Sequence, residues 1–561
     1  MLSFRRSSRS LKPRASKLNS ATIHPLSSCG TPLTSPGKAI AREELFTYTN
    51  GHFLIDEETQ LRRRYLKFDI DALCDLAATA GASPSPIRTI EKLEGGFSKA
   101  LLLTKENDEE VVAKLPYHIA GPASLTTASE VAVLQYVKDY TRIPVPAVLS
   151  WSSDSSNPVG AEYIIMEKAA GVPLYERWEG MAEIERLGLI QNLVKLEAQL
   201  SAIAFPAYGG LYRRVDADPI RSPQACVDVD SSDRFCVGPS CHPSEHVAAT
   251  DSSAPRSESF SHGPWRTLSD LGKSIAKREI SRITHRQSTP GLPFHQGSIQ
   301  EQTQLLKSAV SVFQRIDSHP SIGQSAQPTL WHTDLHMGNI FVAPDESSRI
   351  VSLIDFQSLA IHPRFLQARW PVFLKPPTNY PKGLVKPTLP DGFTSLDEES
   401  QAAALQEFSQ AKLAKAYEVA KFLDDRVAHD AMVNVVPRVF RELFVRCGEV
   451  SEVGTVPLRE CLIEISRNWS ALDFTSECPY SFSDEEISRH ERQFAEYQAW
   501  NDVQQLAMEC LDTDAEGWIA PQLDIAEKRR QNRELLAMWI ERAAEERTSD
   551  EARALWPFPE S

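Results

Sequence analysis

The segment from Trp331 to Asp355, which reads WHTDLHMGNIFVAPDESSRIVSLID, constrains the fold of this chain more than any other segment. His332, Asp334 and Asn339 fill the frame H-x-D-L-x-x-x-N, and the segment ends in Asp355 directly after a short apolar stretch. That stretch is apolar on both sides of its single serine, which indicates a buried strand. The pattern therefore predicts a polar loop followed by a core strand, with two carboxylates and one amide brought close together.

Two carboxylates and an amide in this order are the side chains that phosphoryl transfer from ATP requires. One carboxylate must lie near the attacking hydroxyl, while the amide and the second carboxylate must hold Mg²⁺ on the phosphates. The alternative is a coincidence, in which an Asp-rich loop precedes an ordinary core strand. The correct order and spacing of the matched positions favour the first interpretation.

Two upstream segments have the composition expected of an ATP-binding lobe. Gly95, Gly96 and Ser98 stand before an apolar stretch, where backbone N–H groups and a small hydroxyl would approach phosphates closely. A Gly-Gly pair between strands is also an ordinary hairpin turn. Lys114 stands in the strand-like segment 111–116, VVAKLP, where its ammonium would suit the α- and β-phosphates. The alternative is that this lysine only faces solvent.

Glu130 and a later apolar segment extend the pattern. Glu130 follows Lys114 in a helical repeat of apolar residues, where it would pair with the lysine ammonium. The spacing Thr127-x-x-Glu130 also fits a capping box, in which the glutamate would only satisfy a helix N-terminus. Met166 and Glu167 lie in the sequence YIIMEKAAG, which indicates either a strand leading into a hinge or an ordinary core strand.

In this order, these residues resemble the aminoglycoside phosphotransferase-type kinase family. Further features are similar to its fungal mitochondrial branch, altered inheritance of mitochondria protein 9. They are Phe205-Pro206-x-Tyr208-Gly209-Gly210-Leu211-Tyr212, Gly263-Pro264-Trp265, Ile354-Asp355-Phe356-Gln357 and Leu555-Trp556-Pro557-Phe558. The resemblance covers the chain from about residue 45 onward. It implies an α+β, protein-kinase-like bilobal fold, with a small antiparallel-sheet N-lobe and a large, mainly helical C-lobe.

The resemblance also implies a role for each matched position. Asp334 corresponds to the catalytic base, His332 to a structural brace of the catalytic loop, and Asn339 and Asp355 to the Mg²⁺ ligands. The positions that would contact or position ATP are Gly95, Gly96, Ser98, Lys114, Glu130, Met166 and Glu167. The implied cofactors are therefore ATP and Mg²⁺, and the implied partner is a hydroxyl acceptor.

The chain departs from protein kinases in three ways. Gln357 stands where the D-F-G motif has glycine, and no A-P-E sequence follows at a suitable distance. Both departures argue against an activation loop controlled by phosphorylation and favour a small-molecule kinase. The glycine loop is also shorter than G-x-G-x-x-G.

The expected domain organisation has four parts. Residues 1–42 form a disordered transit peptide, and residues 43–167 form the ATP-binding N-lobe. Residues 168–397 form the core of the C-lobe, with a loop insertion near 213–262 that is rich in Ser, Asp and Pro and has little regular structure. Residues 398–561 form a helical extension that packs on the C-lobe. The alternative for this extension is a pair of partner-binding helices.

The first 42 residues contain no acidic residue and many serines, although the whole chain has a net charge of −15. A basic, serine-rich and acid-free segment is typical of a mitochondrial transit peptide, so we expect a location in the matrix. The alternative is a basic tail with another use. The net negative charge argues against non-specific binding of nucleic acid. Since no apolar run approaches about 18–20 residues, we expect no transmembrane segment.

The sequence thus predicts an ATP-dependent phosphotransferase that acts on a hydroxyl of an unidentified small molecule in mitochondria. Two alternatives remain, a pseudokinase that serves as a nucleotide-binding scaffold and a kinase-fold enzyme that transfers AMP. The presence of Asp334, Asn339 and Asp355 argues against the scaffold, since a chain without catalysis has no chemical need for all three. The acceptor and the oligomeric state do not follow from the sequence.

Overall fold

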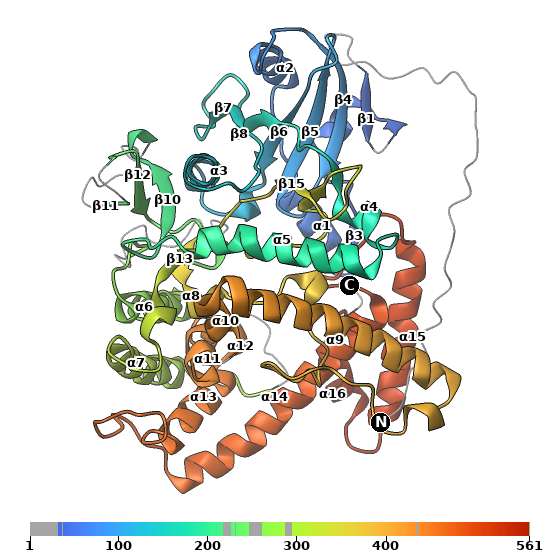
Figure 1. Ribbon diagram of the computed structural model, residues 1–561. Helices are drawn as coiled ribbons and strands as arrows, with labels where there is room; N and C mark the ends of the chain where they lie inside the picture. The colour runs from blue at the N-terminus through green and yellow to red at the C-terminus, as the bar shows by residue number, and fades with distance from the viewer. Residues whose placement is uncertain are drawn as a thin grey trace.

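The computed structural model describes residues 32–35, 37–216, 226–229, 232–245, 261–285, 294–433 and 436–559. They form a small lobe built on a sheet and a larger lobe built mainly of helices (Figure 1). The expected α+β, protein-kinase-like bilobal fold is confirmed, with an antiparallel-rich sheet in the N-lobe and helices in the C-lobe.

Seven strands form the sheet of the N-lobe, in the order β2-β1-β4-β5-β6-β8-β7. All neighbouring strands are antiparallel except β1 and β4, which are parallel. The strands are β1 (Leu33–Ser35), β2 (Lys38–Ala39), β4 (Ile87–Glu94), β5 (Ser98–Lys105), β6 (Glu110–Pro116), β7 (Val148–Ser152) and β8 (Tyr163–Glu167). The helices of this lobe are α1 (Glu57–Arg63), α2 (Ile70–Thr79) and α3 (Leu125–Tyr140).

The two faces of this sheet pack against different helices. On β6, Val111 and Ala113 belong to the core that includes α2, whereas Val112 packs with Val131 of α3. Because successive side chains of a strand point to opposite faces, Lys114 points to the same face as Val112. Simple alternation along β6 therefore directs the lysine toward α3.

The chain enters the C-lobe through Gly171, whose φ of +87° favours glycine. A Cβ atom at this position would lie 2.4 Å from the carbonyl oxygen of Val342. The next strand, β9 (Val172–Pro173), pairs with β14 (Ile340–Val342), which in turn pairs with β15 (Ile350–Leu353). The two strands that follow the polar loop of the sequence motif therefore lie next to the connection between the lobes.

Most of the C-lobe is helical, and its helices share one large apolar core. They are α4 (Leu174–Trp178), α5 (Glu183–Ser201), α6 (Leu268–His285), α7 (Ile299–Ile316), α8 (Arg364–Gln367), α9 (Glu398–Asp424), α10 (Arg426–Met432), α11 (Arg438–Cys447), α12 (Val450–Val453) and α13 (Val456–Arg467). Three helices follow them, α14 (Asp484–Leu511), α15 (Ile525–Ala543) and α16 (Ser549–Ala554), and have a small core of their own. Short strands β13 (Pro328–Leu330) and β16 (Ile361–Pro363) pair beside the polar loop.

The expectation of little regular structure between residues 213 and 262 is wrong for part of the described chain. Strand β12 (Phe235–Gly238) pairs with β10 (Gly210–Arg213) on one side and with β11 (Val227–Asp228) on the other. Phe235 and Val237 enter the C-lobe core, whereas Cys236, between them, packs near Ala128 of α3. A strand buried on both faces explains the difference, because its short apolar run gave no alternating pattern.

The expectation of disorder is wrong for the described end of the segment 1–42. Strand β1 pairs with β4, and β2 pairs with β1, so residues 33–35 and 38–39 extend the sheet of the N-lobe. Leu33 is fully buried in the core of this lobe. The rest of the predicted transit peptide, residues 1–31, lies outside the described residues.

A segment from the C-terminal helices returns to the N-lobe. Strand β17 (Trp518–Ile519) pairs with β3 (His52–Phe53), and the indole N–H of Trp518 donates to the hydroxyl of Tyr48 at 3.0 Å. Arg64 forms an ion pair with Glu516 at 2.6 Å. The N-lobe is therefore fastened to the C-lobe by the hinge and also by this second connection.

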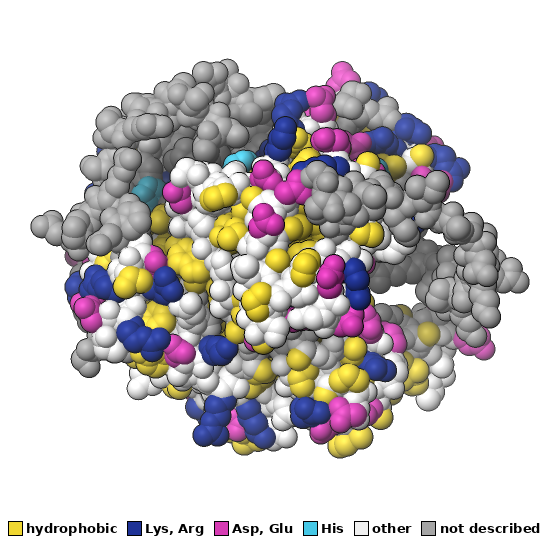
Figure 2. All heavy atoms as spheres, turned by 90° about the horizontal axis from the view of Figure 1, so that it is seen from above, with side chains coloured by type: hydrophobic (Ala, Val, Ile, Leu, Met, Phe, Trp, Pro, Cys, Tyr) yellow, Lys and Arg dark blue, Asp and Glu magenta, His cyan; other side chains and the backbone are white. Residues whose placement is uncertain are grey.

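The charged side chains of the face seen in Figure 2 are mixed, with Lys and Arg interspersed among Asp and Glu. No helix of the described residues is both long and apolar enough to cross a membrane.

Candidate active site

His332 braces the start of the loop between β13 and β14. It is buried, and its Nε2–H donates to the carbonyl oxygen of Ile354 at 2.9 Å. Its Nδ1 accepts from the backbone N–H of Asp334 at 3.3 Å, so the two contacts require the neutral tautomer with the proton on Nε2. Burial lowers the pKa of His332, which favours this neutral form. The histidine thus joins the loop to the residue before Asp355.

Asn339 closes the same loop from its other end. Its side-chain Nδ2 donates to the carbonyl oxygen of Asp334 at 3.0 Å. Its backbone carbonyl accepts from the N–H of Ile354 at 3.1 Å, and its N–H donates to the carbonyl of His336 at 3.0 Å. Within the part of the chain that the structure describes, no group donates to its side-chain oxygen Oδ1, which leaves this atom available to a cation.

Asp355 directly follows the short strand β15 and Ile354. Its φ of +63° lies in the left-handed region, which aspartate tolerates better than most residues. Its Oδ1 lies 2.7 Å from the Nζ of Lys114, and 37% of its side chain is exposed. Burial alone would raise the pKa of Asp355, but the ammonium of Lys114 outweighs this effect and the pKa is lowered. The carboxylate is therefore ionised and open on one side.

Lys114 lies between two carboxylates. Its Nζ is 2.7 Å from Oε1 of Glu130 and 2.7 Å from Oδ1 of Asp355. Lys114 and Glu130 are both buried. Burial alone would lower the pKa of Lys114, but the carboxylates of Asp355 and Glu130 raise it to about 12. The site therefore holds a permanent positive charge where the two lobes meet.

The position of Glu130 in its helix decides between the two alternatives for this residue. Helix α3 begins at Leu125, after Ser124 in the cap position, so Glu130 lies in the second turn of the helix. A capping-box glutamate would stand in the first turn. The capping alternative is therefore wrong, and the carboxylate contacts Lys114 instead.

Gly95, Gly96 and Phe97 form the turn between β4 and β5, in which the N–H of Gly95 donates to the carbonyl of Ser98 at 3.0 Å. Ser98 is buried at the base of the turn. The carbonyl of Gly96 accepts from Nε of Arg64 at 3.2 Å. A Cβ atom on Gly96 would meet no heavy atom within 4 Å. Packing therefore does not require glycine here, whereas the close approach of a ligand would.

Met166 and Glu167 end strand β8, at the connection between the lobes. The side chain of Met166 packs with Val131 and Ile164 on the face toward α3. The carboxylate of Glu167 accepts from the N–H of Ala147 at 3.0 Å, and its own N–H donates to the carbonyl of Ala147 at 3.0 Å. Both side chains and the N–H of Glu167 therefore already have protein partners.

Asp334 carries the exposed carboxylate of the site, with 61% of its side chain accessible. Nε2 of His336 lies 3.9 Å from it, and the guanidinium of Arg369 donates to the carbonyl of Thr333 at 2.5 Å. Burial of part of the group raises the pKa of Asp334, and the negative charge of Asp355 adds to the rise, while His336 and Arg369 oppose it. A carboxylate with a raised pKa is a better proton acceptor.

The residues present fit a nucleotide with Mg²⁺. The Oδ1 of Asn339 and the carboxylate of Asp355 are hard oxygen ligands of the kind that Mg²⁺ prefers. The ammonium of Lys114 is a compact charge suited to phosphate oxygens. Nε2 of Gln357, two residues after Asp355, is buried without a hydrogen-bond partner in the described chain, so a polar donor beside the site is still unsatisfied.

Sequence reasoning missed Arg64 and Arg369, which hold the glycine turn and the polar loop of the sequence motif. Arg64 stands 32 positions from Gly96, and Arg369 stands 36 positions from Thr333. Neither arginine belongs to a motif or to a periodic pattern, and each acts through a contact made only in the folded chain. No local signal distinguishes them from the other arginines of the sequence.

The phosphotransferase enzyme family matches residues 89–366 of this chain. A subtelomeric hrmA-associated cluster protein of Aspergillus fumigatus is 31% identical over 498 residues, which cover 83% of this chain and 95% of that protein. Altered inheritance of mitochondria protein 9 of Yarrowia lipolytica is 22% identical over 518 residues, which cover 85% of each. A solved streptomycin–ATP complex of aminoglycoside phosphotransferase APH(2")-IIa is 14% identical, covers 70% of this chain and 93% of that chain, and has a TM-score of 0.31.

The expected resemblance to these fungal proteins is thereby confirmed. The matched family segment runs from the strand β4 to the helix α8, and so contains Lys114, Glu130, Asp334, Asn339 and Asp355. The chain belongs to the phosphotransferase enzyme family.

Proposed function

We propose that the chain is an ATP-dependent phosphotransferase that acts on a hydroxyl group of a small-molecule acceptor. Family membership supports a phosphotransferase in general. One arrangement carries the finer proposal: the ammonium of Lys114 lies between Glu130 and Asp355, on the loop side where Asp334 presents an exposed carboxylate. This arrangement pairs a fixed positive charge for phosphates with an open proton acceptor.

Asp334 is the proposed catalytic base. Its carboxylate would orient the acceptor hydroxyl and take its proton as the new O–P bond forms and the bond to the leaving ADP breaks. Magnesium–ATP supplies the phosphoryl group. Asn339 and Asp355 would hold Mg²⁺, and Lys114 would hold the phosphates. Catalysis then consists mainly of positioning and charge neutralisation.

The remaining predicted site residues would serve the nucleotide less directly. The backbone N–H groups of Gly95 and Gly96 would approach the phosphates, with Ser98 at the base of the turn. Glu130 would keep the lysine ammonium in place. The backbone at Met166 and Glu167 would meet the adenine ring, since the side chains of both residues already have protein partners.

Thermal unfolding of the full chain with and without Mg²⁺ and ATP tests the nucleotide site. A ligand that binds only the folded state, at about 100 times its dissociation constant, stabilises by about 2.7 kcal/mol. We expect a magnesium-dependent shift that is lost in Asp355→Ala and kept in Asp345→Ala, whose aspartate lies on an exposed turn. Absence of a shift in the unaltered chain would favour the scaffold alternative.

The products separate the two possible chemistries. Phosphoryl transfer releases ADP, whereas transfer of AMP releases pyrophosphate. We expect ADP, because the proposed roles of Asp334, Asn339 and Asp355 are those of a γ-phosphoryl transfer site. Pyrophosphate as the product would overturn this part of the proposal while leaving the nucleotide site intact.

We also propose a location in mitochondria, in the matrix. Residues 1–42 are basic, rich in serine and free of acidic residues, and several relatives are named mitochondrial. A fluorescent reporter fused after residue 60 should reach the matrix. A reporter that remains in the cytosol would refute the proposal.

A further inference from the structure

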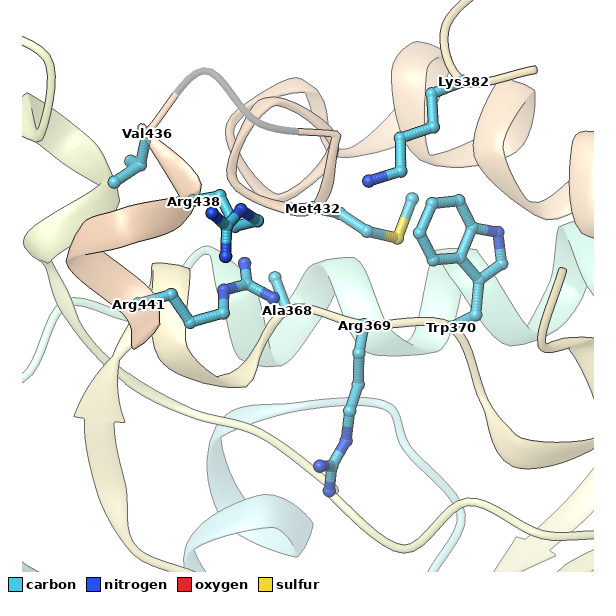
Figure 3. A pocket seen from close by; sticks show the side chains of 8 residues that line it. All are labelled: Ala368, Arg369, Trp370, Lys382, Met432, Val436, Arg438 and Arg441. Atoms are coloured by element: carbon cyan, nitrogen blue, oxygen red, sulfur yellow. The ribbon is translucent and has the colours of Figure 1, made fainter. Parts of the chain in front are cut away.

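The C-lobe has a small cavity of about 230 Å³ with an unusual lining. Its side chains come from the segment after α8, from the proline-rich segment 371–390, and from the helices α10 and α11 with the residue Val436 between them (Figure 3). They include Arg369, Trp370, Lys382, Met432, Arg438 and Arg441. Three of them, Lys382, Arg438 and Arg441, direct their cationic groups toward one another, and none of the lining residues is acidic.

The cations of this cavity differ in how far the protein neutralises them. Arg438 forms ion pairs with Glu464 at 2.6 Å and with Glu442 at 3.7 Å. By contrast, within the described ranges no carboxylate lies within 4.0 Å of Arg369, Lys382 or Arg441. Arg441 instead donates to the carbonyl of Ala431 at 2.9 Å. Cations that gather without a counter-charge repel one another, and an anion bound among them would relieve this repulsion.

Figure 3 shows how these groups are directed. The guanidinium groups of Arg438 and Arg441 lie close together, the ammonium of Lys382 lies on the opposite side, and Met432 contacts Trp370 between them. Helix α11 begins at Arg438, so the positive end of its dipole also faces this region. The cavity therefore presents positive charge beside an apolar wall.

Arg369 connects the cavity with the candidate active site. Its neighbours in sequence, Ala368 and Trp370, line the cavity, whereas its own guanidinium points away from the other cations and donates to the carbonyl of Thr333. Thr333 directly precedes Asp334. The cavity thus lies one arginine side chain away from the proposed catalytic base.

The segment that carries Lys382 is held in place by a buried carboxylate. Glu418 of α9 is fully buried, accepts from the hydroxyl of Tyr380, and accepts from the N–H of Gly383 at 2.6 Å. Lys415 pairs with the same carboxylate at 2.6 Å. These contacts fix the backbone that carries Lys382, so a ligand does not have to order this segment.

We propose that this cavity binds a small acidic molecule that carries a phosphate or carboxylate group. The acidic group lies among Lys382, Arg438 and Arg441, and the apolar part of the molecule contacts Trp370 and Met432. Arginine forks suit both phosphate and carboxylate oxygens.

The experiment measures binding of three related probes by calorimetry, with Mg²⁺ and a non-hydrolysable ATP analogue present to fill the nucleotide site. The probes are glycerol 3-phosphate, glycerate and neutral glycerol. We expect at least one acidic probe to bind about tenfold or more tightly than glycerol, because hydrogen bonds to charged groups are the stronger ones. Preference between the two acidic probes identifies the group. Equal binding of all three would overturn the inference.

Matched variants locate the site. Lys382→Gln and Arg441→Gln should each weaken binding of the acidic probe about tenfold. Lys386→Gln, on the same segment, and Arg446→Gln, on the same helix, lie outside the cavity lining and should leave binding unchanged. Lys382 is exposed, so its loss does not threaten folding. Equal effects of the cavity variants and their controls would refute the site.

The same titrations separate this inference from the proposed function. Binding of an acidic probe that depends on Lys382, in a chain that never binds ATP, would refute the phosphotransferase and keep the anion site. ATP-dependent phosphoryl transfer in a chain that binds neither acidic probe more tightly than glycerol would keep the phosphotransferase and refute the anion site.

Discussion

The ammonium of Lys114 lies 2.7 Å from Asp355, although 241 positions of sequence separate the two residues. The lysine comes from a strand of the N-lobe, and the aspartate follows a strand of the C-lobe. Their contact thus joins the two lobes in a single site. The buried carboxylate of Glu130 also depends on the ammonium of Lys114 for its counter-charge.

Lys114→Met should destabilise the chain by about 3–5 kcal/mol, because it leaves the buried carboxylate of Glu130 without a cation. Urea unfolding measures this loss. Lys168→Met is the control, since Lys168 forms an exposed pair with Glu110 whose loss should cost about 0–1 kcal/mol. The double variant Lys114→Met/Glu130→Gln should recover part of the stability and none of the ATP affinity. Similar small losses in both single variants would contradict the prediction.

Asp334→Asn should lower kcat by about 10²–10⁴-fold and leave nucleotide affinity nearly unchanged, because the carboxylate is exposed and contacts no predicted nucleotide ligand. Steady-state rates together with ATP titrations measure the two effects separately. Equal loss of turnover and of ATP binding would show that Asp334 serves the nucleotide and not the acceptor.

The activity should fall on acidification at a pH above the ordinary aspartate pKa of about 3.9. Asp334 acts as the carboxylate, so activity is lost as the pH falls through its pKa, and burial raises that pKa. His336 opposes the rise, and His336→Gln should therefore move the acidic limb of kcat/KM to still higher pH. An acidic limb that does not respond to His336→Gln would contradict the assignment of this limb to Asp334.

Gly96→Ala should change the KM for ATP and leave stability nearly unchanged, whereas Gly171→Ala should lower the stability of the fold. A Cβ on Gly96 meets no atom within 4 Å, so Gly96→Ala should change the free energy of unfolding by at most about 1 kcal/mol. Its effect should be a higher KM for ATP. Gly171→Ala places a Cβ 2.4 Å from the carbonyl of Val342 at a φ of +87°, and should destabilise by about 1–3 kcal/mol or more. Unchanged KM in Gly96→Ala would remove this turn from the nucleotide site.

Glu516→Gln should raise the KM for ATP about threefold to tenfold without a change in kcat. Glu516 pairs with Arg64 at 2.6 Å, and Arg64 holds the carbonyl of Gly96 at 3.2 Å. Loss of one charge-assisted hydrogen bond loosens the arginine that fixes the turn. Glu485→Gln is the control, because Glu485 is exposed on α14 and pairs with Arg489 of the same helix. Equal KM values for the two variants would show that the contact has no influence on the nucleotide site.

The parts of the site that were predictable from the sequence are those that depend on local spacing. His332, Asp334 and Asn339 share one loop, and Lys114 follows the alternation of its strand, so order and period were enough. The arginines Arg64 and Arg369 could not be predicted, because their roles depend on contacts across the folded chain. The basic cavity is a further example, since Lys382 and Arg441 come from elements that no sequence pattern connects.

The same distinction holds for the fold. The apolar repeat around Glu130 predicted the helix α3, and the helical extension predicted for residues 398–561 contains α9, α11, α13, α14 and α15. Strands β11 and β12 were missed because each is short and β12 is buried on both faces. The pairing of β3 with β17 could not be predicted from a local pattern. Each strand has only two residues, and the two strands lie far apart in the sequence.

The pairing of β3 with β17 affects when the N-lobe can complete its folding during synthesis. His52 and Phe53 leave the ribosome early, whereas their partners Trp518 and Ile519 are synthesised more than four hundred residues later. Chains are made at about 5–20 residues per second, so the first lobe waits tens of seconds for its last strand. During that interval Tyr48 also lacks the indole that it will contact. Completion of the nucleotide-binding half is therefore a late event, reached only when nearly the whole polypeptide exists.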